Sequence, residues 1–357
     1  MFKIGGHYYT RTTNKELLEK ASYGGVASAI LYHLLSEKKI DYAIAVESFA
    51  ITSGKPVFID KPSKVLDVAG SFTVSPINVS KILRDYAKKD ERVAAVVKPC
   101  EEKAIEYLIK KGVLKRENIF IIGLNCGGLF DPISLAKNLE EKNIRPDEVK
   151  LINYSDKYIE LVLRDNTVIR INKLDIGVRA GYRDACRRCL LQTPKMSDIA
   201  LGSWGLLPKY EKYTYTIPLT KRGCNVLSEM YEKGLIEMVE VPEEGKKLRE
   251  NIINVVRKSA EIYRQKEYEL LDKIGVSEIL SKCLLCLECW HVCPIRSENE
   301  VFVWKKNIDP VLGQNSVTTY MHDKCVECGS CEDVCPVNIP FSLIIQRIRD
   351  LRKELGI

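Results

Sequence analysis

The stretch CLLCLECWHVCP (Cys283–Pro294) decides how the C-terminal part of this chain folds. Its four cysteines follow the spacing C-x2-C-x2-C-x3-C-P, and CVECGSCEDVCP (Cys325–Pro336) repeats that spacing. Three cysteines on one tight loop can hold three corners of an iron–sulfur cubane, whereas the fourth cysteine of such a run ligates the other cluster of a pair. A module built around two [4Fe–4S] clusters is therefore expected.

Exchange of the fourth cysteine gives each cluster three ligands from one run and one ligand from the other. One set is Cys283, Cys286, Cys289 and Cys335, and the other set is Cys325, Cys328, Cys331 and Cys293. Structural zinc is the alternative, but zinc sites usually consist of two separated C-x2-C or C/H pairs. Both runs have a third cysteine, again after two intervening residues, and both end in Cys-Pro. These features favour iron–sulfur clusters over zinc.

The composition is that of a globular protein. The 357 residues are 45% hydrophobic and 29% charged, which suits two domains or one domain with an appended module. A net charge of +7 is too small to indicate nucleic-acid binding. The chain begins without an apolar signal segment, and the longest uncharged stretch (21–36) is too short to span a bilayer. With thirteen cysteines, we expect a cytoplasmic protein that is not inserted into a membrane and whose thiols bind metal.

Before residue 246 the chain alternates between helical and strand patterns. Helices are predicted over 26–35, 77–88, 101–111 and 132–142, and strands over 41–46, 93–97 and 119–124. A hairpin over 158–163 and 168–171 should add an antiparallel element to this α/β sheet. Further helices are predicted over 246–273 and 341–355.

The predicted organisation has three parts. Residues 1–245 form an α/β domain with α+β elements and a mixed sheet, residues 246–276 form a helical connector, and residues 277–357 form the ferredoxin-like two-cluster module with a closing helix.

Four more cysteines lie in the first domain. Cys100 and Cys126 each follow a predicted buried strand, and Cys186 and Cys189 form a C-x2-C loop. Ligands gather at the carboxyl ends of parallel strands, so these four thiols could form one site. Free cysteines are also commonly buried as small apolar residues, and spacing alone leaves the two interpretations open. Cys224 has no partner in the pattern and is expected to be structural.

Four segments resemble the beta-subunit family of coenzyme F420 hydrogenases and dehydrogenases. They are YGGVASAILYHLL (Tyr23–Leu35), KPCEEKAI (Lys98–Ile105), GLNCGG (Gly123–Gly128) and CRRCLLQTPKMSDIALGSWG (Cys186–Gly205). The resemblance covers roughly residues 15–260 and is strongest at the last segment, which looks most like the formate dehydrogenase branch of the family. Lys98 departs from it, because many members carry a small residue there.

The resemblance implies a third [4Fe–4S] cluster on the four dispersed cysteines and a FAD that exchanges a hydride with coenzyme F420. A flavin accepts two electrons together and releases them singly, which the clusters require. The partner that the resemblance implies is a molybdenum or tungsten formate dehydrogenase catalytic subunit. The chain has no recognisable pterin-binding domain, so we expect that it does not oxidise formate alone. An F420H2 dehydrogenase, a hydrogenase or a heterodisulfide-reductase complex stays open, as does a flavin-free multi-cluster carrier or a zinc-bearing binding protein.

Candidate cofactor contacts form two groups. Helix starts that could approach the phosphates of FAD are at Gly24, Gly25 and Val26 and at Ser75 and Asn78. Residues that could bind the phosphodiester and glutamate tail of F420 are Lys98, Arg179, Arg183 and Arg188, and Asn125 is a further candidate for a cofactor contact. A Gly-Gly pair before a helix is often only a turn, and the arginines could instead tune a cluster or form salt bridges. No acid–base set is discernible, so we expect no catalytic side chain and assign the chemistry to the cofactors.

Overall fold

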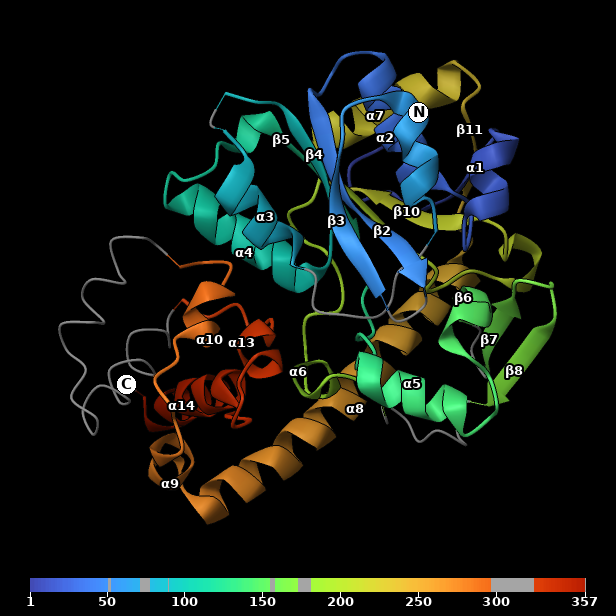
Figure 1. Ribbon diagram of the computed structural model, residues 1–357. Helices are drawn as coiled ribbons and strands as arrows, with labels where there is room; N and C mark the ends of the chain where they lie inside the picture. The colour runs from blue at the N-terminus through green and yellow to red at the C-terminus, as the bar shows by residue number, and fades with distance from the viewer. Residues whose placement is uncertain are drawn as a thin grey trace.

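The computed structural model describes residues 1–50, 53–70, 78–88, 90–154, 158–172, 181–296 and 324–356. An eight-stranded mixed sheet organises the first part of the chain, in the order β11-β1-β10-β9-β5-β4-β2-β3 (Figure 1). Its strands are β1 Tyr8–Thr12, β2 Tyr42–Ala50, β3 Ser53–Ile59, β4 Val93–Val97, β5 Ile119–Leu124, β9 Ile199–Gly202, β10 Thr214–Pro218 and β11 Ile236–Glu240. The strands β2, β4, β5 and β9 are parallel neighbours, and every other pairing in this sheet is antiparallel.

Helices cover both faces of the parallel strands. They are α1 Lys15–Lys20, α2 Val26–Ser36, α3 Val79–Tyr86, α4 Pro99–Lys110 and α7 Lys221–Glu232. Alternate side chains of β5 point to opposite faces, so Ile121 packs in the core under α3 and α4, whereas Ile122 packs in the core under α2 and α7. A strand buried on both faces needs a continuous apolar run, which explains IFIIGL in β5.

A second sheet and one long helix complete the first part of the molecule. The sheet has the order β6-β7-β8 and consists of β6 Val149–Tyr154, β7 Tyr158–Leu163 and β8 Val168–Asn172, next to α5 Pro132–Glu140. The helix α8, Glu243–Ile274, runs from the main sheet to the cysteine-rich module (Figure 1). That module contains α9 Val276–Ser281, α10 Glu288–His291, α13 Ser330–Asp333 and α14 Phe341–Leu355.

Apolar packing joins α8 to the module. Tyr268 and Leu271 of α8 lie in one buried cluster with Ile339 and Ile344, and cysteines of both runs border that cluster. Within the described residues, no helix is long and apolar enough to cross a membrane.

Most predicted elements are confirmed, with three differences. The hairpin exists, but it pairs with β6 in a separate sheet, so the antiparallel members of the main sheet are β1, β3, β10 and β11 instead. The helix predicted from residue 101 already begins at Pro99, since a proline fits the first helical turn. The helix predicted from residue 77 is α3, capped by Asn78, and its proposed Ser75-Pro76 start lies outside the described residues.

Candidate functional site

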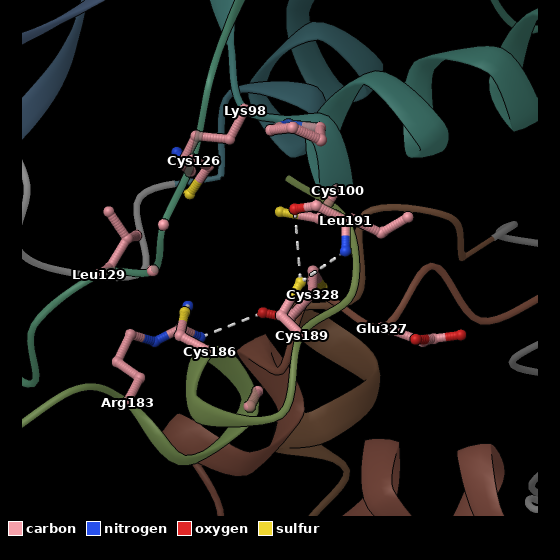
Figure 2. Close-up of a pocket in the computed structure, with 14 residues that line it drawn as sticks. Lys98, Cys100, Cys126, Leu129, Arg183, Cys186, Cys189, Leu191, Glu327 and Cys328 are labelled. Carbon is pink, nitrogen blue, oxygen red and sulfur yellow. Dashed lines mark hydrogen bonds between the residues drawn. The ribbon is translucent and has the colours of Figure 1, made fainter. Parts of the chain in front are cut away.

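The four dispersed cysteines meet at the carboxyl edge of the parallel strands. Cys100 lies in the first turn of α4 directly after β4, and Cys126 follows β5. Cys186 belongs to the short helix α6 (Asp184–Arg187), and Cys189 follows it. All four line one pocket (Figure 2). The structure therefore brings together the thiols that the sequence placed in three separate segments.

Two buried glutamates of α4 hold the loops around this pocket. Glu102, which is 5% exposed, accepts hydrogen bonds from the backbone amides of Lys195 (2.8 Å) and Ser197 (2.7 Å). Glu101 accepts from the Lys98 amide (2.7 Å), from Lys98 Nζ (2.8 Å) and from the Val79 amide (2.8 Å). These bonds fix the segment after Cys189 and the start of α3 against the helix that carries Cys100.

The spacing of the sulfurs distinguishes between metals. A tetrahedral zinc site with Zn–S distances of about 2.3 Å places its sulfurs about 3.8 Å apart. In the described part of the chain, which includes all twelve cysteines of the three sets, no three cysteine sulfurs lie within 4.8 Å of one another. The sulfurs in each set are thus farther apart than a four-thiolate zinc ion requires.

Three thiols of the pocket, those of Cys100, Cys126 and Cys189, would be protonated without a metal. Burial raises the pKa of Cys126 to about 11 and that of Cys189 to about 12, and the neighbouring Cys186 thiolate adds to both shifts. A metal must therefore displace the protons, and its positive charge compensates for the burial of the thiolates.

The second set lies directly against this pocket. Cys328 lines the pocket itself, and the Cys328 thiol lies near Cys100. Burial raises the pKa of Cys293, and the nearby thiolates of Cys328 and Cys325 add to that shift. Cys293 thus lies with the run that follows it, as the exchange of the fourth cysteine predicts.

Close approach of the two loops depends on a glycine. Gly329 has φ +71°, and a Cβ at this position would overlap the Cβ of Ala185. Ala185 and Cys186 are consecutive, so Gly329 lets the loop of the second set touch the loop of the first.

The remaining set lies farther out in the module. Burial raises the pKa of Cys289 to about 12, and the thiolates of Cys283, Cys286 and Cys335 add to the shift. Cys335 therefore joins the run that precedes it. Cys286 is the exposed member among the thirteen cysteines, and Leu284 beside it is 65% exposed.

Two of the predicted F420-binding arginines have other partners. Arg188 is 1% exposed and donates to Glu267 (2.7 Å), to both oxygens of Glu332 (2.6 Å) and to Ser342 Oγ (3.0 Å). Arg183 is 6% exposed and pairs with Asp333. Both guanidiniums are engaged by carboxylates of the same chain, as the salt-bridge alternative expects, and their assignment to F420 stays a prediction. Arg179 lies outside the described residues.

The other candidate contacts have structural partners in the chain. Gly24 lies so close to the backbone of Thr10 and Thr214 that a Cβ would clash, and Asn78 caps α3 by accepting from the Lys81 amide (3.2 Å). Lys98 lines the cysteine pocket and pairs with Glu101 at 2.8 Å.

Among the candidates that the structure describes, the start of α2 has no side-chain cap. Gly25 is its N-cap with φ +68° and supplies no side-chain cap, and the helix continues with Val26. The first amides of an α-helix lack intrahelical acceptors and favour a negative charge. Ser75 lies outside the described residues.

Sequence reasoning missed Arg249 of α8. This side chain is 6% exposed, donates to Asn125 Oδ1 (3.1 Å) and lies over the Tyr215 ring (4.7 Å to its centroid). Among the described residues no carboxylate pairs with it, and burial lowers its pKa. The only sequence signal was an arginine on a charged helix, because its contacts come from segments distant in sequence.

An α/β domain with a four-cysteine pocket, followed by two interleaved cysteine runs, defines a class of iron–sulfur electron-transfer subunits. Family comparison agrees, since residues 282–339 match the 4Fe-4S dicluster domain. The N-terminal and C-terminal models of the coenzyme F420 hydrogenase/dehydrogenase beta subunit match residues 7–84 and 90–244. The chain belongs to this beta-subunit family, which confirms the resemblance seen in the sequence.

Individual relatives extend over different shares of the chain. The F420-dependent formate dehydrogenase subunit beta of Methanocaldococcus jannaschii is 29% identical over 97% of this chain and 94% of its own length. The coenzyme F420 hydrogenase subunit beta of Methanococcus voltae is also 29% identical, over 65% of this chain and 84% of its own length. A chain of the solved F420-reducing [NiFe] hydrogenase complex from Methanosarcina barkeri shares the fold, with 22% identity, a TM-score of 0.64 and coverage of 77% of this chain and 95% of that chain.

Proposed function

We propose that this chain is the beta subunit of an F420-dependent formate dehydrogenase. It would exchange electrons between coenzyme F420 and a catalytic subunit that holds a molybdenum or tungsten pterin. The similarity to formate dehydrogenase beta subunits extends over 97% of the chain, whereas the similarity to the Methanococcus voltae hydrogenase beta subunit covers 65%. Only the longer alignment can include both the α/β domain and the complete dicluster module.

The observation that carries the proposal is the contact between thiol sets. The pocket of Cys100, Cys126, Cys186 and Cys189 also contains Cys328 of the second set. The second set in turn shares its two cysteine runs with the outer set. Clusters held at these positions would form a continuous path from the α/β domain to the module surface near Cys286.

FAD, when bound, would supply the conversion between the hydride of F420 and the single electrons of the clusters. The uncapped start of α2 at Gly25 and Val26 suits its phosphates. The chain's own residues hold the cysteine loops through Glu101 and Glu102, and the four cysteines of the first set are half-buried.

In this proposal residues 1–245 form the F420/FAD domain, residues 246–276 form the connector and residues 277–357 form the two-cluster module. Reduced metal-binding thiols also favour a cytoplasmic setting.

The test uses the full chain, purified and reconstituted anaerobically with iron, sulfide and FAD. We expect about twelve irons per chain and reduction of F420 by the chemically reduced protein, followed at the deazaflavin absorbance band. The isolated chain should not oxidise formate with a dye acceptor. Oxidation should appear after addition of a pterin-containing catalytic subunit.

Matched variants connect this activity to the site. Cys126→Ala should lose about four irons and F420 turnover, whereas Cys224→Ala should keep both, because Cys224 is buried in the core under α2 and α7. Absence of turnover in a FAD-replete wild type would refute the F420 assignment. Oxidation of formate by the isolated chain would refute the need for a separate catalytic subunit.

A further inference from the structure

Arg183 lies where the first two cysteine sets meet. It precedes α6 in the chain and is 6% exposed. One terminal nitrogen, Nη1, lies 3.5 Å from Cys186 Sγ, and the other, Nη2, donates to the backbone carbonyl of Cys328 at 3.2 Å. A single guanidinium thus touches a ligand sulfur of the first set and the backbone of a ligand of the second set (Figure 2).

Among the described residues this guanidinium has one carboxylate partner. Its carboxylate partner is Asp333 of α13, which accepts from Nε at 3.1 Å and from Nη2. Asp333 belongs to the module, and its side chain is 23% exposed. The guanidinium therefore contacts Cys186 Sγ, the Cys328 carbonyl and the Asp333 carboxylate at the same time.

A cation in this position acts on both neighbouring sites. Hydrogen bonds to ligand sulfurs and nearby charge are among the factors that set the reduction potential of an iron–sulfur cluster. A positive charge favours the reduced, more negative form, and burial strengthens the effect because water does not screen it. The planar fork of arginine can also hold two acceptors in a fixed relation, which a lysine cannot.

We propose that Arg183 is a positioning residue for electron transfer between the first and second clusters. It holds Cys186 and Cys328 in one hydrogen-bonded unit and raises the reduction potential of the cluster at Cys186, with Asp333 as a counterweight that limits the rise. The inference rests on the proposed function, because it requires clusters in both sets.

The experiment compares Arg183→Gln, Arg183→Lys and Asp333→Asn in the anaerobically reconstituted full chain. Iron content is measured first, and then the midpoint potentials are determined by redox titration followed by electron paramagnetic resonance. Arg183→Gln should lower one midpoint by at least a tenfold change in the one-electron equilibrium constant, which is about 59 mV. Asp333→Asn should shift the same midpoint upward. Arg183→Lys keeps the charge and should shift the midpoint less than Arg183→Gln, but it should weaken the magnetic coupling between the clusters.

Arg222→Gln is the matched control. Arg222 also pairs with a buried carboxylate, Asp198 (2.8 Å), but its other contacts are the backbone carbonyls of Glu117 and Ile119 and the Phe120 ring, and not a cysteine. Its midpoints should equal those of the wild type. Opposite shifts in the Arg183→Gln and Asp333→Asn variants require an electrostatic role, which a purely structural contact would not produce.

The outcomes separate this inference from the proposed function. Unchanged midpoints in Arg183→Gln and Asp333→Asn, with iron retained, would overturn the role of Arg183 and leave the clusters intact. If Arg183→Gln fails to retain iron, the midpoint potential of Asp333→Asn tests the inference instead. An upward shift supports the role of Arg183, and no shift or a downward shift overturns it. A wild type without iron–sulfur signals would instead overturn the proposed function.

Discussion

Replacing Arg188 with methionine removes a buried cation that joins three helices. Arg188 contacts Glu267 of α8, Glu332 of α13 and Ser342 of α14. Loss of one partner from a buried ion pair costs about 3–5 kcal/mol, because the other charge stays buried without compensation. Glu332 keeps the backbone amides of Ser342 (2.8 Å) and Leu343 (3.2 Å), and the side chain of Glu267 is 22% exposed, so we expect the lower end, about 3 kcal/mol.

Hydrogen exchange of the α14 amides measures this change in the folded, cluster-loaded protein. A loss of about 3 kcal/mol corresponds to exchange roughly two orders of magnitude faster. Arg347→Met is the matched control, since Arg347 joins α14 to Asp272 of α8 through a pair at 2.6 Å whose carboxylate side chain is 46% exposed. Exposed pairs contribute about 0–1 kcal/mol, so its exchange should accelerate about fivefold or less. Equal acceleration in the two variants would refute the reasoning from burial.

Three further perturbations test other parts of the structure. Glu102→Gln should destabilise the protein by about 1–3 kcal/mol in denaturant unfolding, because the backbone amides of Lys195 and Ser197 lose a charged acceptor. Glu106→Gln on the same helix should change the stability little, because the Glu106–Lys110 pair is exposed. Similar losses in the two variants would contradict a stabilising role of the Glu102 hydrogen bonds. Gly329→Ala should cost about 2–4 kcal/mol through a clash and a positive φ, whereas Gly112→Ala, with φ +69° but open space, should cost about 1 kcal/mol. Burial lowers the pKa of His33 from 6.5, so its contribution to stability is full above about pH 6.5 and is lost as the pH falls below that value. The melting temperature should thus fall less between pH 7.5 and 5.5 in His33→Gln than in wild type, and parallel curves would exclude His33 as the cause.

The sequence predicted those parts of the fold that depend on residues close together in the chain. The two cysteine runs follow from ligand spacing, and β4 and β5 follow from apolar runs that both faces of the sheet bury. Strands β1, β10 and β11 were not predicted, since YYTRT, TYTIP and IEMVE are short and mix polar with apolar residues. Their pairing depends on contacts such as Thr10 Oγ1 with Thr216 Oγ1 (2.6 Å), which join residues far apart in the chain.

The same distinction applies to the site. The sequence showed that Arg183 and Arg188 lie next to cysteines, but it could not show their partners, because Asp333 and Glu332 come from the module more than a hundred residues later. A positive residue near a cluster loop therefore indicated a cofactor contact as readily as an ion pair. Choosing between the two interpretations required the position of the module against the first domain.

The exchange of the fourth cysteine also constrains how the protein is made. Cys335 lies with Cys283, Cys286 and Cys289, and Cys293 lies with Cys325 and Cys328. A ribosome that has produced only the first run has not yet supplied a complete ligand set for either cluster of the module. The set that includes Cys293 is complete only after Cys331 and the other set only after Cys335, so both module sites must wait for the second run and then mature close together. The first-domain set can be complete once Cys189 has emerged, so biogenesis would proceed from the α/β domain outward.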